Sequence, residues 1–308
     1  MRSQVLVALA VVSLLTSRPA DAANSCRLVR VTSVDLGTDE SGGVYVPMTI
    51  AGQNVNLLID TGGILSMLTE SEIKVLGLPK QILPPETRMS MFGGTKIDHF
   101  TWAYGVVLGG LKSNQLHFLI MPDGDLPSQM GGTLAPDIMS AYDVEFDFAN
   151  AKFGLFRQDH CPGEVVYWTR SDSVRIPFEV DRMGHINFPV QVDGQKILAT
   201  LDTGSSRSIA SFEEVKSDFK IDEKTPDMKL VSDAGEKRHT YHYPFKTLTF
   251  GGVTVNNPDL LLVPNDDSRM MGWTGDPKMI IGMGILRQLH LYVAYGERAL
   301  YVTPASAH

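Results

Sequence analysis

Apolar and polar residues alternate along two widely separated stretches of the chain. The alternating apolar positions are Val44, Val46, Met48 and Ile50 in the first stretch and Ile186, Phe188, Val190 and Val192 in the second. A period of two is typical of a half-buried β-strand. Each stretch runs into a turn with glycine, Gly52 or Gly194, and then into a second aliphatic run. The pattern therefore predicts a β-hairpin in each half of the chain.

The two hairpins belong to an internal repeat. Residues 44–63 align without a gap on residues 186–205, at an offset of 142, and six of the 20 positions are identical. The same offset relates two further pairs of segments, 108–111 with 250–253 and 118–122 with 260–264. A repeat of this length predicts two structurally similar lobes.

Helical periodicity is confined to short segments, so we expect a mainly β protein. The predicted helices cover residues 69–76, 135–142, 211–219 and 284–289. Two more hairpin-like stretches, 89–100 and 230–241, are candidates for mobile flaps over a cleft. The candidate flap residues at their turns are Phe92, Gly93, Gly94, Ala234 and Gly235.

The N-terminal residues have the pattern of an export signal. Arg2 precedes an apolar run from Val5 to Leu15, and Ala20-Asp21-Ala22 gives a small-x-small cleavage pattern, so residues 1–22 are predicted to be a signal peptide. A membrane anchor is the alternative, but the run is shorter than the roughly 20 apolar residues that span a bilayer. We expect the mature protein in the periplasm or outside the cell.

The segment 158–175 contains Cys161, Pro162 and Gly163 and lies between the repeats, which predicts a linker there. The N-terminal lobe is then residues 23–165 and the C-terminal lobe residues 166–308. Cys26 and Cys161 are the only cysteines, and a pair in an oxidising compartment is usually bonded. The sequence predicts a disulfide between them, with two buried free thiols as the alternative.

Composition and charge limit the classes of partner that we expect the protein to bind. With 43% apolar and 20% charged residues, the chain has the profile of a folded globular protein. The 27 basic residues are outnumbered by 35 acidic ones, and no basic run is present, which argues against nucleic acid as a partner. No second long apolar run occurs, so we expect a monomer without membrane contact after signal cleavage.

Both repeats pass from an aliphatic strand into the same triplet, Asp60-Thr61-Gly62 and Asp202-Thr203-Gly204. Here the sequence resembles the aspartic proteases, the pepsin and retropepsin superfamily, whose two catalytic aspartates each lie in an Asp-Thr-Gly loop. It is similar to the single-chain form with two retropepsin-like lobes. The resemblance implies an all-β, two-lobed acid-protease fold with the active-site cleft between the lobes.

The resemblance implies that Asp60 and Asp202 are catalytic, that the substrate is a peptide or protein, and that neither cofactor nor metal is needed. It assigns supporting roles to the rest of the two loops, Thr61, Gly62, Gly63, Thr203, Gly204 and Ser205. In the family, the threonine hydroxyls lock the loops together and the glycines let backbone N–H groups approach the carboxylates.

Two carboxyl groups about 3 Å apart cannot both ionise, so such a pair holds one proton over a wide pH range. The ionised member can draw a proton from water while the protonated member donates to the substrate carbonyl oxygen. This chemistry predicts an aspartic endopeptidase. A bond from the Ser205 hydroxyl would favour ionised Asp202, so we expect Asp60 to carry the proton.

The chain departs from the family pattern twice. Gly63 follows the first triplet where the family has Ser, Thr or Ala, whereas Ser205 in the second loop is ordinary. The family's apolar-apolar-Gly element is present as Ile280-Ile281-Gly282, but the first lobe has Ala135 at the glycine position. These departures favour the alternative hypothesis, a weak or inactive peptide-binding module on a protease scaffold.

Overall fold

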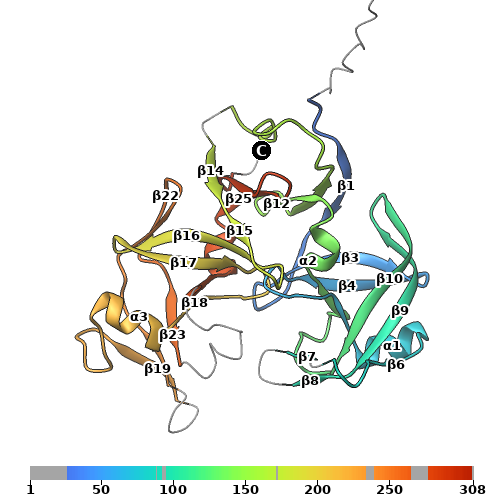
Figure 1. Ribbon diagram of the computed structural model, residues 1–308, viewed down its shortest axis with the longest axis horizontal. Coiled ribbons are helices and arrows are strands. Elements are labelled where there is room, and N and C mark those ends of the chain that lie inside the picture. The colour runs from blue at the N-terminus through green and yellow to red at the C-terminus, as the bar shows by residue number, and fades with distance from the viewer. Residues whose placement is uncertain are drawn as a thin grey trace, which may run out of the picture.

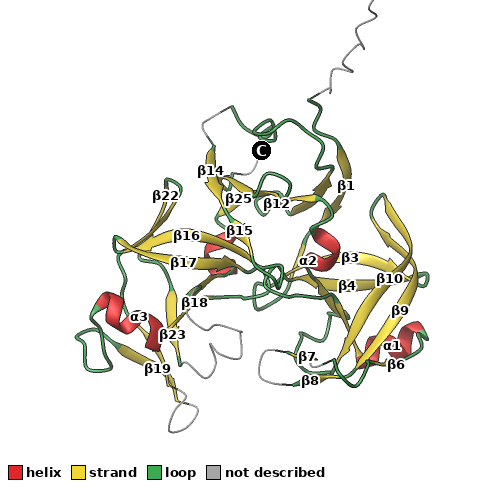
Figure 2. Ribbon diagram, viewed as in Figure 1, coloured by secondary structure: helices red, strands yellow, loops and turns green. Residues whose placement is uncertain are grey.

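The computed structural model describes residues 26–87, 89–91, 95–170, 173–233, 239–264 and 277–306. The predicted signal peptide and the five candidate flap residues, Phe92, Gly93, Gly94, Ala234 and Gly235, lie outside these ranges. Within them the chain is mostly strand with a few short helices (Figure 2), which confirms the prediction of a mainly β protein. None of the helices described is long and apolar enough to cross a membrane.

Both predicted hairpins are present. β3 (Val44–Ile50) pairs antiparallel with β4 (Gln53–Ile59), and β16 (Ile186–Val192) with β17 (Gln195–Leu201). Both turns place two residues at positive φ, 50° and 80° in the first and 46° and 82° in the second, as hairpin turns of type I′ require. The non-glycine residue Asp193 is held there because its carboxylate accepts the N–H of Thr247 at 2.8 Å.

The first half forms a sheet with the strand order β2-β3-β4-β11-β5-β10-β9-β6, and pairing of β3 with β9 closes it on itself (Figure 1). The added strands are β2 (Gly37–Thr38), β5 (Met67–Thr69), β6 (Gln81–Ile82), β9 (His99–Leu108), β10 (Leu111–Met121) and β11 (Gly132–Leu134). The other elements of this lobe are β7 (Met89–Ser90), β8 (Lys96–Ile97), α1 (Glu70–Leu76) and α2 (Pro136–Met139). β7 and β8 pair at the base of the first predicted flap.

The second half has an equivalent strand order around its aspartate strand, β19-β20-β23-β18-β24-β17-β16-β21-β22, with β15 paired to β16. Its strands are β15 (Glu179–Val180), β18 (Ser208–Ser211), β19 (Lys229–Asp233), β20 (His239–His242), β21 (Thr247–Phe250), β22 (Val253–Asn256), β23 (Leu260–Val263) and β24 (Met279–Ile281). Its helices are α3 (Phe212–Phe219) and α5 (Met283–Leu286). β19 and β20 form the base of the second predicted flap.

A third sheet joins the halves in the order β1-β13-β12-β25-β26-β14. Its strands are β1 (Arg30–Asp35), β12 (Asp143–Asp147), β13 (Lys152–Phe156), β14 (Val174–Pro177), β25 (Leu289–Ala294) and β26 (Ala299–Pro304). Within this sheet the two halves meet at the antiparallel pair β12–β25. The predicted disulfide is confirmed, since Cys26 bonds to Cys161 in the connection between β13 and β14. The predicted lobe border at residues 165/166 falls in the same connection and stays a prediction.

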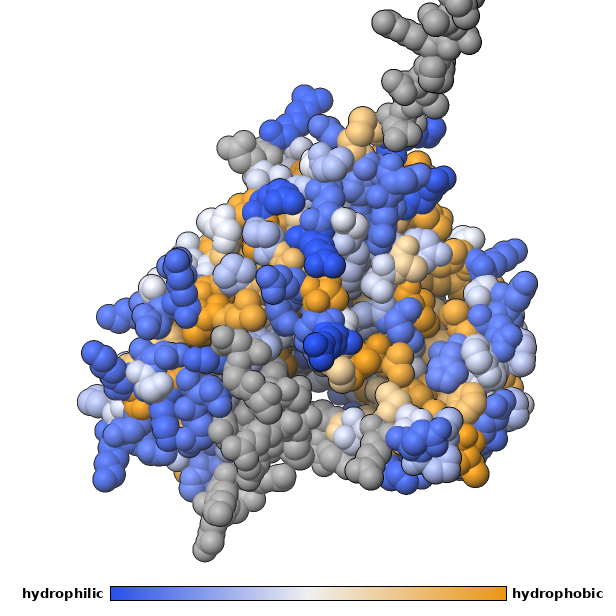
Figure 3. Space-filling view, in the orientation of Figure 1, coloured by the Kyte–Doolittle hydropathy of each residue, from blue (hydrophilic) through white to orange (hydrophobic). Residues whose placement is uncertain are grey.

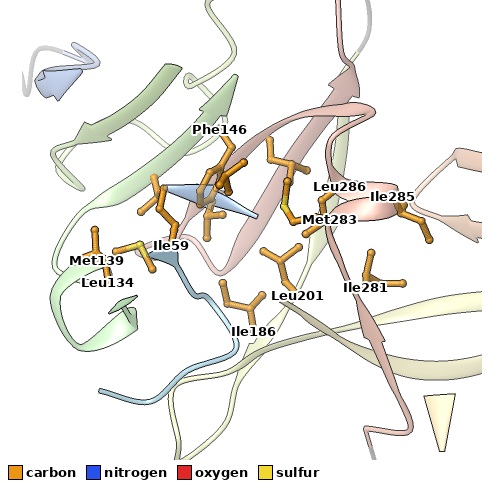
Figure 4. Packing of buried hydrophobic residues seen from close by; sticks show 14 of the residues in the cluster. Ile59, Leu134, Met139, Phe146, Ile186, Leu201, Ile281, Met283, Ile285 and Leu286 are labelled. Carbon is orange, nitrogen blue, oxygen red and sulfur yellow. The ribbon is translucent and has the colours of Figure 1, made fainter. Parts of the chain in front are cut away.

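One continuous apolar core spans both lobes. Figure 4 shows Ile59 and Leu201, the last residues of β4 and β17, among buried side chains from both halves of the chain. Both residues have 1% or less of their surface exposed. Burying each aliphatic side chain contributes about 1.5–3 kcal/mol, and the shared core fixes the ends of these two strands relative to each other.

Two titratable side chains are buried together beside the third sheet, which is called the central sheet from here on. His160 Nε2 lies 2.5 Å from Asp143 Oδ2, and both side chains are almost fully enclosed. Burial opposes the charge on His160, but its hydrogen bonds to Asp143 and to the Cys161 carbonyl outweigh burial and raise its pKa. Burial raises the pKa of Asp143 despite the bond to His160.

Because the pKa of His160 is raised, the folded protein holds a proton on its ring that the unfolded chain releases between the two pKa values. The resulting stability is complete below the unfolded pKa of histidine, about 6.5, and is lost as the pH rises through the folded value. We expect His160→Gln to cost about 1–3 kcal/mol at pH 5.5 and less at pH 8.5. Urea unfolding at both pH values checks this, and an equal cost at both would contradict it.

Candidate active site

Each lobe presents its aspartate at the end of a strand held by a parallel neighbour. β4 runs parallel to β11, and the Asp60 N–H donates to the Leu134 carbonyl at 2.9 Å. β17 runs parallel to β24, and the Asp202 N–H donates to the Ile281 carbonyl at 3.1 Å. The two loops that follow leave their lobes and meet at the centre of the molecule (Figure 1).

Four reciprocal hydrogen bonds tie the two loops together. The Thr61 N–H donates to Thr203 Oγ1 at 3.1 Å, and the Thr203 N–H donates to Thr61 Oγ1 at 3.0 Å. The Thr61 hydroxyl in turn donates to the Leu201 carbonyl at 2.9 Å, and the Thr203 hydroxyl to the Ile59 carbonyl at 2.7 Å. Both threonines are fully buried, so none of these bonds competes with water.

The glycines allow each carboxyl group to approach the opposite loop. A Cβ atom on Gly62 would collide with the Asp202 carboxyl group, and one on Gly204 would collide with that of Asp60. The Gly62 N–H donates to Asp60 Oδ1 at 3.1 Å, and the Gly204 N–H donates to Asp202 Oδ1 at 2.8 Å. The two carboxyl groups also share a hydrogen bond. The structure thus brings Asp60 and Asp202 into contact.

The pair has raised pKa values. For Asp202, burial and then the negative charge of Asp60 raise the pKa to about 7. For Asp60, burial also raises the pKa, but N–H groups of Gly63 and Gly62 and the bond from Asp202 oppose it. These contacts favour the charge on Asp60 and the proton of the pair on Asp202.

This assignment reverses the one expected from the sequence. The Ser205 hydroxyl donates to the backbone carbonyl of Arg207 at 2.7 Å instead of to Asp202. Only the Ser205 backbone N–H reaches Asp202, at 3.2 Å. The bond from that hydroxyl, on which the expected proton position depended, is therefore not formed, and the expectation that Asp60 carries the proton loses its structural basis.

The two departures from the family pattern are accommodated locally. A Cβ atom at Gly63 would lie 2.7 Å from Asp60 Oδ2, so glycine leaves room for this carboxylate. The N–H of Ala135 donates to Ser66 Oγ as that of Gly282 donates to Ser208 Oγ, at 2.9 and 3.0 Å. Both backbones are extended there, and only Gly282 is crowded, by the Arg207 carbonyl.

Two further groups near the site escaped sequence reasoning. Asp137 accepts both the N–H and the hydroxyl of Ser66, which holds the end of the first loop. Asp181 fixes a turn by accepting the N–H of His185 and contacting its ring, and the charge of His185 lowers the pKa of Asp60. The offset of 142 would have found this turn, because Asp39 fixes its counterpart in the first lobe.

Comparison with known proteins agrees with this architecture. A family model described as aspartyl protease matches residues 46–134 and 188–285, more than half of the chain, including both Asp-Thr-Gly loops. The chain belongs to the aspartyl protease family. No match was found among curated proteins. The crystal structure of basic 7S globulin from soybean resembles this family member with a TM-score of 0.53 and 8% identity, over 89% of this chain and 96% of that one. That likeness shows the two-lobed fold.

Removing the Thr203 hydroxyl tests how far the four hydrogen bonds of Thr61 and Thr203, called the threonine lock, hold this member of the aspartyl protease family together. Thr203→Val leaves the Ile59 carbonyl and the Thr61 N–H buried without partners, so we expect a loss of about 2–4 kcal/mol in unfolding free energy. Thr203→Ser keeps the hydroxyl and should cost less than about 1 kcal/mol. Urea unfolding of the two variants checks the difference, and equal losses would argue against the lock.

The raised pKa of Asp202 gives a second prediction. Protonated Asp202 contributes stability to the folded protein that is complete below about pH 4, the pKa of the unfolded chain. This contribution is lost as the pH rises through the folded pKa of about 7. We expect Asp202→Asn to be more stable than the native protein at pH 8, by on the order of 1–3 kcal/mol, and the gain to vanish near pH 4. Thermal unfolding measures this, with exposed Asp125→Asn as the control. A gain that does not depend on pH would contradict the assignment.

Proposed function

We propose that this member of the aspartyl protease family is an endopeptidase in which Asp60 and Asp202 activate a water molecule. The observation that supports this most strongly is the contact between two buried carboxyl groups held by the threonine bonds, where burial and the charge of Asp60 raise the pKa of Asp202 to about 7. A general base and a general acid are thereby present together at neutral or lower pH.

In the proposed reaction, Asp60 accepts a proton from a water molecule whose oxygen attacks the peptide carbonyl carbon. Asp202 donates its proton to the carbonyl oxygen, which gives a neutral tetrahedral diol. When the C–N bond breaks, the nitrogen takes the proton held by Asp60, and a diol hydroxyl returns its proton to Asp202. The products are a carboxylic acid and an amine, and the pair ends in its starting state.

The alternative function is peptide binding without cleavage. In its favour, the same fold is found in a soybean protein that is named as a globulin. Against it, Gly63 and Ala135 leave both carboxyl groups in place, so neither departure removes a part that the reaction needs. We therefore favour catalysis.

We also propose that the protein works outside the cytoplasm, in the periplasm or beyond the cell. The bond between Cys26 and Cys161 supports this, because disulfides persist mainly in oxidising compartments. The export pattern in residues 1–22 points the same way. The proposed substrates are accordingly peptides or unfolded proteins of that compartment.

Cleavage of a diverse peptide library between pH 3 and pH 8 tests the proposal. Because the working state needs the proton on Asp202, we expect activity to fall as the pH rises past about 7. Asp60→Asn and Asp202→Asn should each lose roughly 10²–10⁴-fold in kcat. A peptide with a hydroxyl in place of the scissile carbonyl should bind more tightly than the substrate it mimics. Intact peptides at every pH, together with equal binding of the two ligands, would favour the binding module.

A further inference from the structure

The internal repeat makes positions beside the two catalytic loops directly comparable. In the first lobe Met67 of β5 lies opposite Leu119, which lies opposite Phe100. In the second lobe Ile209 of β18 lies opposite Leu261, which lies opposite His242. Every pair obeys the offset of 142, so Leu65 and Arg207, two residues before Met67 and Ile209, occupy equivalent places.

In the first lobe this place is apolar. Leu65 packs in a cluster with Met67, Phe100 and the two methionines at the base of the first predicted flap, Met89 and Met91. Leu65 directly follows the Asp60 loop in the chain, and this cluster connects it to the base of that flap. Figure 3 shows apolar side chains gathered on the first lobe beside the hollow between the lobes.

In the second lobe the equivalent place is charged. Arg207 Nη2 donates to both carboxylate oxygens of Asp259, at 2.8 and 2.7 Å. His242, on the strand β20 of the second predicted flap, has its Nε2 3.9 Å from Asp259. The counterpart of Asp259 in the first lobe is His117. Its ring packs against that of Phe100, with the two ring centroids 5.0 Å apart.

Arg207 is placed and equipped to bind an anion. It lies five residues after Asp202, and its side chain is 46% exposed. Within the part of the chain that the structure describes, its only side-chain partner is Asp259, through Nη2, so Nε and Nη1 can still donate. A guanidinium offers N–H groups in a planar fork that matches a carboxylate.

We propose that Arg207 binds an acidic side chain of the substrate on the second lobe's side of the cleft, while the wall around Leu65 receives an apolar side chain. Asp259 holds the guanidinium in position. The proposal rests on the proposed function in so far as the site binds peptides. It adds a class of substrate, a peptide with apolar and acidic residues placed on opposite sides of the catalytic pair.

Matched peptides that differ only by Glu, Gln or Lys at one position test the proposal. Each position within four residues of the cut is varied in turn, and kcat/KM is compared for the native protein and its variants. We expect one position at which Glu is preferred at least tenfold. Arg207→Gln should abolish that preference, Arg207→Lys should retain part of it, and Arg207→Glu should reverse it in favour of Lys. Arg157→Gln, which removes another arginine from an exposed ion pair, with Asp159, should leave it unchanged.

The result that overturns the proposal is a native protein without a Glu preference, or one whose preference persists in Arg207→Gln. If Arg207→Gln does not fold, Arg207→Lys and Arg207→Glu still provide the comparison, because a preference that is the same in both contradicts a role for the charge. A uniform loss of kcat/KM for all peptides would assign Arg207 to loop structure and would also contradict the proposal.

The same peptides separate this proposal from the proposed function. If none is cut, their binding to the native protein and to Arg207→Gln is measured by fluorescence anisotropy. A Glu preference in binding that Arg207→Gln removes would uphold the role of Arg207 and overturn catalysis. Cleavage without a Glu preference would do the reverse, and peptides that are neither bound nor cut would overturn both.

Discussion

Two acidic groups that repel one another are held in contact, and the rest of the structure serves that contact. Burial raises the pKa of both Asp60 and Asp202, and the charge of Asp60 raises that of Asp202 further. The pair is therefore stable only with a proton shared between the two carboxyl groups. Backbone N–H groups of Gly62 and Gly204 stabilise the charge that remains. Because the two aspartates come from different lobes, their contact depends on how rigidly the lobes are joined. The threonine lock, the common core and the central sheet supply that rigidity.

The duplication reproduces the geometry of the site and lets its chemistry diverge. Strand pairing, the threonine bonds and the serine that holds each loop end recur at the offset of 142 or close to it. Side chains differ where backbone does not constrain them. Gly282 cannot become alanine without striking the Arg207 carbonyl, whereas Ala135 meets no such obstacle. The family's glycine is therefore retained in one lobe and dispensable in the other.

The sequence predicted most of what depends on short-range pattern. The hairpins follow from the alternation of Val44 to Ile50, and the equivalence of the lobes from a single offset. The proton position was not predictable, because it depends on whether the Ser205 hydroxyl turns toward Asp202 or toward the Arg207 carbonyl. The central sheet was missed for another reason. Its key pair, β12 with β25, joins segments about 145 residues apart, and no short-range pattern specifies that pairing.

The differences between the lobes bear directly on how a symmetric pair of aspartates could act asymmetrically. Two identical carboxyl groups in identical loops would share the proton equally, and neither would be committed to the role of acid or base. Here His185 lowers the pKa of Asp60, and its counterpart at the offset of 142 is Gly43, which carries no charge. Gly63 also brings its N–H to Asp60 without adding a side chain. Both differences favour the charge on Asp60, so the divergence of the two halves places the two aspartates in unequal electrostatic surroundings.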